Sequence, residues 1–135
     1  MQYDTWLDAD RTGPQWLARA DIAAIVKQSL HFYAPVAYTL HAFCVMSNHV
    51  HMVLTLPEGI EKPFHKILQA QKRYSATQSN RLLGLSGQFW ARESYDHVVR
   101  NPAEFDRVIA YVLNNPVKAG LVANWQDWPH TYWAP

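Results

Sequence analysis

Residues 45–54, with the sequence VMSNHVHMVL, place two histidines inside an apolar run that is typical of a β-strand. Side chains of an extended strand alternate between its two faces, so His49 and His51 are predicted to share one face, about 6 to 7 Å apart along the strand. Two imidazoles at this spacing can bind one metal ion. The same pattern also suits a sheet face that binds no ligand, so a third metal ligand has to come from elsewhere in the chain.

Length and composition predict one domain spanning residues 1–135. A chain of 135 residues is long enough for a hydrophobic core and too short for two ordinary domains. Its 49% apolar residues, with six Trp, seven Tyr and five Phe, argue against disorder. The formal net charge is only +1, so a nucleic-acid partner would need a local basic patch.

The chain carries no signal for secretion or membrane insertion. Its single cysteine, Cys44, cannot form an internal disulfide, and no apolar run has the length of a membrane span. The first residues do not resemble a signal peptide. We therefore predict a cytoplasmic protein with no membrane partner.

The first half of the chain is predicted to run from a loop through a helix into a β-hairpin. Residues 1–15 mix charges with a Gly-Pro pair and are expected to form a surface loop, followed by one or two helices over residues 15–30. Strands are expected at 36–45 and 49–56, joined by a tight turn. The second strand should face the core with Val50, Met52, Leu54 and Leu56.

A long helix is predicted over residues 61–83, and a short strand region over residues 88–99. The helix carries five of the twelve Lys and Arg residues, opposed only by Glu61. These five are Lys62, Lys66, Lys72, Arg73 and Arg81. A solvated helix face would explain them, and so would contact with DNA phosphates, where Lys and Arg provide affinity without sequence preference.

The next helix has a well-defined start. Asn101 suits the N-cap, Pro102 the first helical position, and Glu104 the third position of a capping box. The helix must end before Pro116, because proline lacks an amide donor and disfavours helical geometry at the preceding residue. Its core stripe is predicted to comprise Phe105, Val108, Ile109, Val112 and Leu113.

Tyr111 lies outside this stripe, about 130° from its centre. Asn115 follows four residues later and therefore shares the face of Tyr111. A tyrosine and a carboxamide are thus presented side by side, away from the core. Taken alone, Tyr111 would more often be an amphipathic surface residue than a nucleophile.

Four aromatic residues crowd the C-terminal tail, namely Trp125, Trp128, Tyr132 and Trp133. Such side chains can stack on unpaired bases. More often they hold a terminal segment against the core, and we favour that interpretation.

With both motifs in view, residues 45–54 and the stretch 111–122 (YVLNNPVKAGLV), the chain resembles the single-tyrosine (Y1) HUH transposases of insertion sequences. It is most similar to the branch of REP-associated tyrosine transposases. Further likeness lies in residues 13–17, in the Ile22–Ala23 helix, in residues 72–80, and around Phe89, Trp90, Tyr95 and Asp96.

The resemblance implies an α+β fold, with a ferredoxin-like antiparallel sheet and helices on one face. The family's first strand normally precedes the region that matches residues 1–17. We therefore expect this chain to lack that strand. A missing central strand would leave an exposed sheet edge and would favour association or instability.

The same resemblance implies roles for individual residues. His49 and His51 would bind a divalent metal ion, Tyr111 would be the nucleophile, and Asn115 would complete the metal site. Asn114 is the less suitable amide, because it faces about 60° away from Tyr111. The family's metal is Mg²⁺ or Mn²⁺, although nitrogen ligands also accept Ni²⁺, Co²⁺ or Zn²⁺.

The implied activity is that of a metal-dependent single-stranded DNA endonuclease and strand transferase, acting at hairpin or repetitive palindromic DNA through a 5′-phosphotyrosine intermediate. The bond energy is conserved in such an intermediate, so no nucleotide cofactor is needed. Two alternatives remain. One is a metal-dependent phosphodiesterase in which water attacks, and the other is a degenerate module that binds hairpin DNA without cutting it. The protein is expected to act as a monomer or a homodimer.

Overall fold

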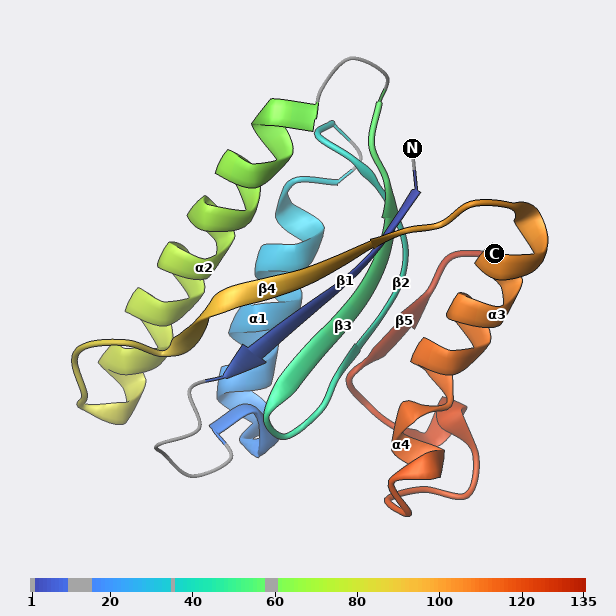
Figure 1. Cartoon of the computed structure of the whole chain (residues 1–135). Helices are drawn as coiled ribbons and strands as arrows, with labels where there is room; N and C mark the ends of the chain where they lie inside the picture. The colour runs from blue at the N-terminus through green and yellow to red at the C-terminus, as the bar shows by residue number, and fades with distance from the viewer. Residues whose placement is uncertain (1, 10–15, 35, 58–60) are drawn as a thin grey trace.

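The computed structural model describes residues 2–9, 16–34, 36–57 and 61–135, without the side chains of residues 61–63 and 92–94. A five-stranded sheet forms the centre of the molecule, with helices on both faces (Figure 1). Its strand order is β4-β1-β3-β2-β5, and every neighbouring pair is antiparallel. The strands are β1 (Gln2–Ala9), β2 (Thr39–Val45), β3 (His49–Thr55), β4 (Trp90–Val98) and β5 (Thr131–Trp133).

Two long helices connect the first four strands of the chain. In chain order, β1, α1 (Ala20–Phe32), β2, β3, α2 (Glu61–Leu83) and β4 follow the βαββαβ pattern of ferredoxin-like folds. Two further helices follow, α3 (Pro102–Leu113) and α4 (Asn115–Lys118). Short 3₁₀ turns occur at η1 (Trp16–Ala18) and η2 (Trp125–Asp127). The predicted α+β ferredoxin-like fold is confirmed.

The expectation that the first strand is missing was wrong. Residues 2–9 do not form a loop but the interior strand β1, which pairs with β3 on one side and with β4 on the other. Their sequence alternates with period two, so that Thr5 and Leu7 face the core and Asp4, Trp6 and Asp8 face the other side. The charges that made the segment resemble a loop occupy a single face. Residues 10–15 lie outside the described part.

One face of the sheet is covered by α1 and α2. The predicted inner residues of the hairpin, Val50, Met52, Leu54 and Leu56, are all buried there. Phe64 and Leu68 of α2 pack into the same cluster. Tyr38 belongs to this cluster, and its buried hydroxyl donates to the carbonyl of Leu30 at 2.6 Å.

The prediction of helices on one face holds for α1 and α2 but not for α3, which covers the opposite face. There its apolar stripe meets Ala42, Cys44 and Val53 of β2 and β3. The stripe is as predicted, with Ile109, Val112 and Leu113 buried and Phe105 and Val108 partly buried. A sheet with apolar residues on both faces needs cover on both, which is the physical reason for the third layer.

Local signals determine both ends of α3. The Asn101 side chain caps the helix by accepting a hydrogen bond from the Glu104 amide at 2.8 Å, as predicted. The helix ends at Leu113, and the chain turns at Asn114 into the short helix α4, where Pro116 is buried.

The C-terminal tail then returns to the sheet as β5, and Trp128 donates from Nε1 to the carbonyl of Val45 at 3.0 Å. Among the described helices, none is both long and apolar enough to cross a membrane.

Candidate metal and tyrosine site

His49 and His51 lie on β3 and point to the face covered by α3. The hairpin register explains this, because the alternate residues Val50 and Met52 face the opposite core. His51 is 3% exposed, and the pKa of His49 is lowered mainly by burial, with Asp8 opposing and His51 adding to the shift. A lowered pKa keeps the His49 imidazole neutral near pH 7, which is the form that binds metal.

The fold brings Tyr111 and Asn115 to the two histidines. The ring centroids of Tyr111 and His51 are 5.6 Å apart at an interplanar angle of 74°. Asn115 Nδ2 lies 3.3 Å from His49 Nε2. Asn114 does not take this place, because its side-chain amide donates to the Ala110 carbonyl at 2.9 Å. Four residues predicted from two distant motifs therefore form one cluster.

Three residues of β1 complete the cluster. The Trp6 ring stacks on His49 with centroids 4.2 Å apart and an angle of 6°, and is tilted against His51 at 4.8 Å. Trp6 Nε1 donates to Asp8 Oδ1 at 2.6 Å. Asp4 Oδ1 pairs with His51 Nε2. The sequence analysis missed all three, although the period-two pattern DxWxD at positions 4–8 was the available signal.

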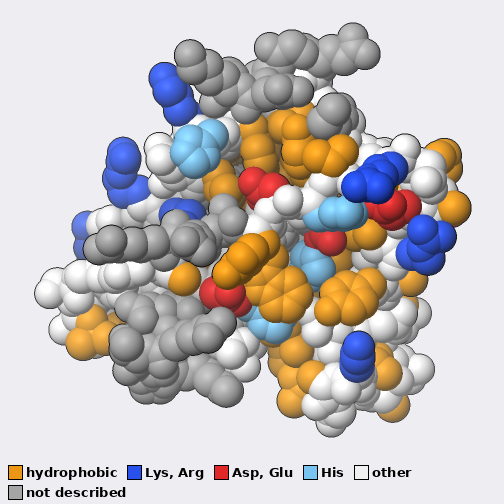
Figure 2. All heavy atoms as spheres, in the orientation of Figure 1, with side chains coloured by type: hydrophobic (Ala, Val, Ile, Leu, Met, Phe, Trp, Pro, Cys, Tyr) orange, Lys and Arg blue, Asp and Glu red, His pale blue; other side chains and the backbone are white. Residues whose placement is uncertain are grey.

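An open hollow of about 610 Å³ adjoins the cluster. We call it the site hollow and define it by Asp4, Trp6, Asp8, His51, Tyr95, Asp96, His97 and Tyr111. Figure 2 shows histidine, acidic and hydrophobic side chains gathered at the centre of this face. Tyr111 is 48% exposed, so its side chain is accessible to a large substrate.

Two basic residues that the sequence analysis did not single out lie close to Tyr111. Lys118 Nζ lies 5.7 Å from the centroid of the Tyr111 ring. Arg107 is exposed on α3, one helical turn before Tyr111 and on the same face. These two residues place positive charge on the side of the cluster where Tyr111 lies.

The donor set around the histidines fits a divalent ion. Among the described residues, no group of three or more His, Cys, Asp or Glu side chains is placed to hold a metal, so such a site depends on the Asn115 amide. The amide nitrogen of Asn115 lies 3.3 Å from His49 Nε2. Flipping the side-chain amide would exchange its nitrogen and oxygen, so that the oxygen would face His49 Nε2 instead. His51 Nδ1 is buried and has no hydrogen-bond partner in the described part of the chain. Two imidazoles and an amide oxygen are ordinary metal donors.

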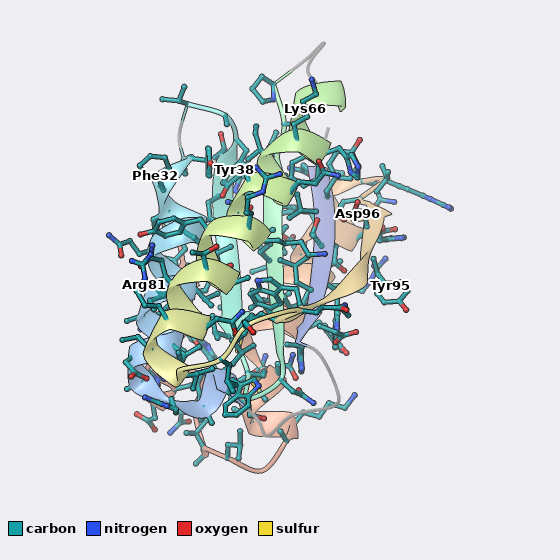
Figure 3. All side chains as sticks on the ribbon, turned by 90° about the vertical axis from the view of Figure 1, so that its left-hand side faces the viewer. Phe32, Tyr38, Lys66, Arg81, Tyr95 and Asp96 are labelled. Atoms are coloured by element: carbon teal, nitrogen blue, oxygen red, sulfur yellow. The ribbon has the colours of Figure 1, made fainter. Side chains whose placement is uncertain are left out.

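The predicted DNA-binding residues are on α2, which packs on the other side of the sheet. Lys66, Arg73 and Arg81 are exposed there, and Figure 3 shows Lys66 and Arg81 near opposite ends of the helix. Lys72 donates from Nζ to the Ala91 carbonyl at 2.9 Å, and burial lowers its pKa. The side chain of Lys62 lies outside the described residues. The structure therefore does not bring the basic helix to Tyr111.

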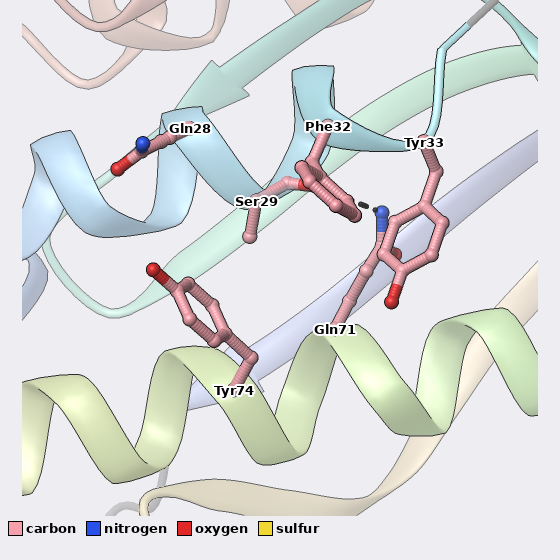
Figure 4. Close-up of a pocket in the computed structure, with 6 residues that line it drawn as sticks. All are labelled: Gln28, Ser29, Phe32, Tyr33, Gln71 and Tyr74. Carbon is pink, nitrogen blue, oxygen red and sulfur yellow. Dashed lines mark hydrogen bonds between the residues drawn. The ribbon is translucent and has the colours of Figure 1, made fainter.

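A smaller cavity of about 200 Å³ lies between α1 and α2 (Figure 4). It is lined by Gln28, Ser29, Phe32, Tyr33, Gln71 and Tyr74. The Gln71 amide spans the two helices, donating to the Ser29 carbonyl at 3.2 Å and to the Tyr38 hydroxyl at 2.6 Å. These contacts tie α1 to α2, so the cavity belongs to the packing of the helical layer.

Comparison with known proteins supports the resemblance. A REP-associated tyrosine transposase of Escherichia coli K12 is 28% identical over 92 residues, which cover 68% of this chain and 52% of that protein. The chain is similar to the REP-associated tyrosine transposases. A Haemophilus influenzae protein matches with 26% identity over 98 residues, covering 67% of this chain and 56% of its own length. The chain thus spans about half the length of these curated relatives.

A solved structure confirms the fold. The REP-associated tyrosine transposase bound to a REP hairpin superposes with a TM-score of 0.72 at 23% sequence identity, covering 96% of this chain and 74% of that one. No protein-family model matches the chain. The resemblance predicted from the two motifs is confirmed by these comparisons, which do not test the roles of the individual residues.

Proposed function

We propose that this chain is the catalytic unit of a transposase-like enzyme that cuts and rejoins single-stranded DNA at a hairpin or a repetitive palindrome. The observation that carries the proposal is the cluster itself, in which Tyr111 packs against His51 and Asn115 meets His49. The similarity to REP-associated tyrosine transposases supports it.

In the proposed reaction, the phenol oxygen of Tyr111 attacks a backbone phosphorus. A bond from the tyrosine to phosphorus forms while the bond from phosphorus to the 3′ oxygen breaks. The phenol loses its proton and the leaving 3′ oxygen gains one. Since the number of phosphoester bonds is unchanged, attack by a 3′ hydroxyl reverses the step without a nucleotide cofactor.

His49, His51 and Asn115 would hold a divalent ion, with Mg²⁺ or Mn²⁺ as the proposed metal. Such an ion would draw charge from the non-bridging phosphate oxygens. Phosphate has to enter a hollow that already contains several aspartates. Lys118 and Arg107 would counter the resulting repulsion at the side of the nucleophile.

The exposed cations of α2 would hold the DNA stem away from the chemistry. Because α2 and Tyr111 lie on opposite sides of the sheet, DNA that touches both would pass around the edge strand β4. Tyr95 and Asp96 project from that strand (Figure 3). Contacts of α2 with phosphates would add affinity without selecting a sequence.

The test is covalent capture of DNA. The purified chain is incubated with a labelled single-stranded hairpin and Mg²⁺ or Mn²⁺, and the products are separated on a denaturing gel. We expect a slowly migrating protein–DNA adduct that disappears with a chelator and in Tyr111→Phe. Tyr74→Phe is the matched control, because Tyr74 is also 48% exposed but lies on α2.

Other outcomes separate the alternatives. Cleavage without an adduct, retained in Tyr111→Phe, would show that water attacks and that the chain is a metal-dependent phosphodiesterase. Tight binding with intact DNA under every condition would show a hairpin-binding module. Either result would refute the proposed tyrosine chemistry.

A further inference from the structure

Asp4 makes a direct polar contact with one of the two candidate metal-binding histidines. Its carboxylate pairs with Nε2 of His51, and the two side chains are 18% and 4% exposed. The contact links β1 to β3, where Trp6 is the direct cross-strand partner of His51. Because β1 is paired with a strand on each side, Asp4 lies on a rigid element.

The His51 ring is held from several sides. Trp6 lies against it at 4.8 Å, Tyr111 meets it nearly edge-on, and Asp4 occupies its Nε2. Nδ1 is the ring atom that has no hydrogen-bond partner in the described part of the chain. Metal-binding histidines are commonly oriented in this way, by a carboxylate on one ring nitrogen.

Charge gives Asp4 a second role. Two neutral imidazoles and an amide bring no negative charge to a divalent ion, whereas Asp4 adds one negative charge beside His51. A negative charge next to a ligand imidazole favours the binding of a cation at that imidazole.

We infer that Asp4 is a positioning residue for the metal site, fixing the His51 imidazole and supplying negative charge beside the ion. The inference rests on the proposed function, because it assigns Asp4 to the same site. Asp4 acts through His51, so its loss weakens the binding of the metal more than it changes the chemical step. The neighbouring His49 is contacted differently, because Trp6 stacks on its ring and Asn48 Oδ1 lies 2.9 Å from its Nδ1.

The experiment measures the affinity of the full chain for Mn²⁺ by calorimetry, in the absence of DNA. Asp4→Ala removes both the contact and the charge, and we expect about 10- to 100-fold weaker binding. Asp4→Asn keeps the shape and an oxygen acceptor, so it should fall between Asp4→Ala and the parent chain. Asp96→Asn is the matched control, because Asp96 lines the same hollow without a described hydrogen bond to either imidazole, and its affinity should stay close to that of the parent.

A second readout uses the adduct assay at increasing Mn²⁺ concentration. For Asp4→Asn, the Mn²⁺ concentration giving half-maximal rate should rise while the maximal rate is largely retained. Thermal unfolding of each variant without metal checks that it is folded, and the near-isosteric Asp4→Asn keeps the test valid if Asp4→Ala unfolds.

The possible failures are distinguishable. Unchanged Mn²⁺ affinity in folded Asp4→Asn and Asp4→Ala, with a parent chain that binds Mn²⁺ and forms the adduct, would overturn the role of Asp4 alone. A parent chain that binds no divalent ion would overturn the metal site and the role of Asp4 together. An equal loss in Asp96→Asn would show a general field effect and would also overturn the assignment.

Discussion

Tyr111 combines two properties that a nucleophile for DNA needs. It is half exposed, so a backbone phosphate can approach it, and its ring is fixed against the buried His51. The chain after Tyr111 forms the short helix α4, in which the Lys118 amide donates to the Asn114 carbonyl at 2.9 Å. This turn brings the Lys118 ammonium over the tyrosine ring.

Lys118→Ala should therefore slow adduct formation. Loss of a charge-assisted contact to phosphate costs about 1.5 to 3 kcal/mol, which corresponds to roughly tenfold or more in rate. The measurement is the single-turnover rate at saturating hairpin. Lys66→Ala provides the comparison, since Lys66 lies on α2 across the sheet and should weaken hairpin binding without slowing the saturated rate. Identical effects of the two substitutions would argue against a local role of Lys118.

At the scale of elements, helix α3 places Tyr111 next to the histidines. Its buried residues Ile109, Val112 and Leu113 fix its rotation, so that Tyr111 faces the site and not the sheet. Its start is fixed by Asn101, and by Glu104, whose carboxylate binds His97 Nε2 at 2.7 Å. The pKa of Glu104 is lowered first by that hydrogen bond. The cap thus ties α3 to the end of β4.

Asn101→Ala should lower the free energy of unfolding by about 1 kcal/mol, within a range of about 0.5 to 2, because one amide of the first turn loses its acceptor. Urea denaturation followed by circular dichroism measures the change. Asn124→Ala is a matched control, since Asn124 occupies the N-cap of η2 but makes no side-chain capping bond. A loss of the same size in both variants would contradict the capping explanation.

At the scale of the whole molecule, several partly buried histidines should make stability depend on pH. Burial is the main reason why the pKa values of His31, His41 and His130 lie below the ordinary 6.5. The positive charge of Lys27 lowers the pKa values of His31 and His130 further. The unfolded chain then binds protons at a higher pH than the folded one. Stability is therefore fully present above pH 6.5 and declines as pH falls below it.

We expect the melting temperature to fall between about pH 7.5 and about pH 5.5, measured with a chelator present so that metal release does not contribute. Asp21 and Glu104 do not confound this window. Their pKa values are lowered from 3.8 and 4.5, so their contribution is lost only at more acidic pH. His41→Gln, which removes a histidine whose Nε2 bonds Thr55 Oγ1, should reduce the pH dependence. An unchanged or higher melting temperature at the lower pH would refute the prediction.

Local periodicity and capping were enough to predict much of the fold and the cluster. The hairpin, the start of α3 and its core stripe follow from patterns within about a dozen residues. The shared face of His49 and His51 follows from the strand period, and that of Tyr111 and Asn115 from the helical period. The likeness of two motifs to one family then suggested that these pairs meet.

What only the tertiary structure decided depends on contacts between distant segments. Strand β1 is held by pairing on both sides, so Gln2–Ala9 forms a strand despite its two charges, and Asp4 and Trp6 reach the histidines only through that pairing. Helix α3 covers the face of the sheet that α1 and α2 leave uncovered. The same arrangement separates the basic helix α2 from Tyr111. The sequence by itself determined which residues share a face, because that depends on local geometry. The partners of each face depended on the whole chain packing around one sheet.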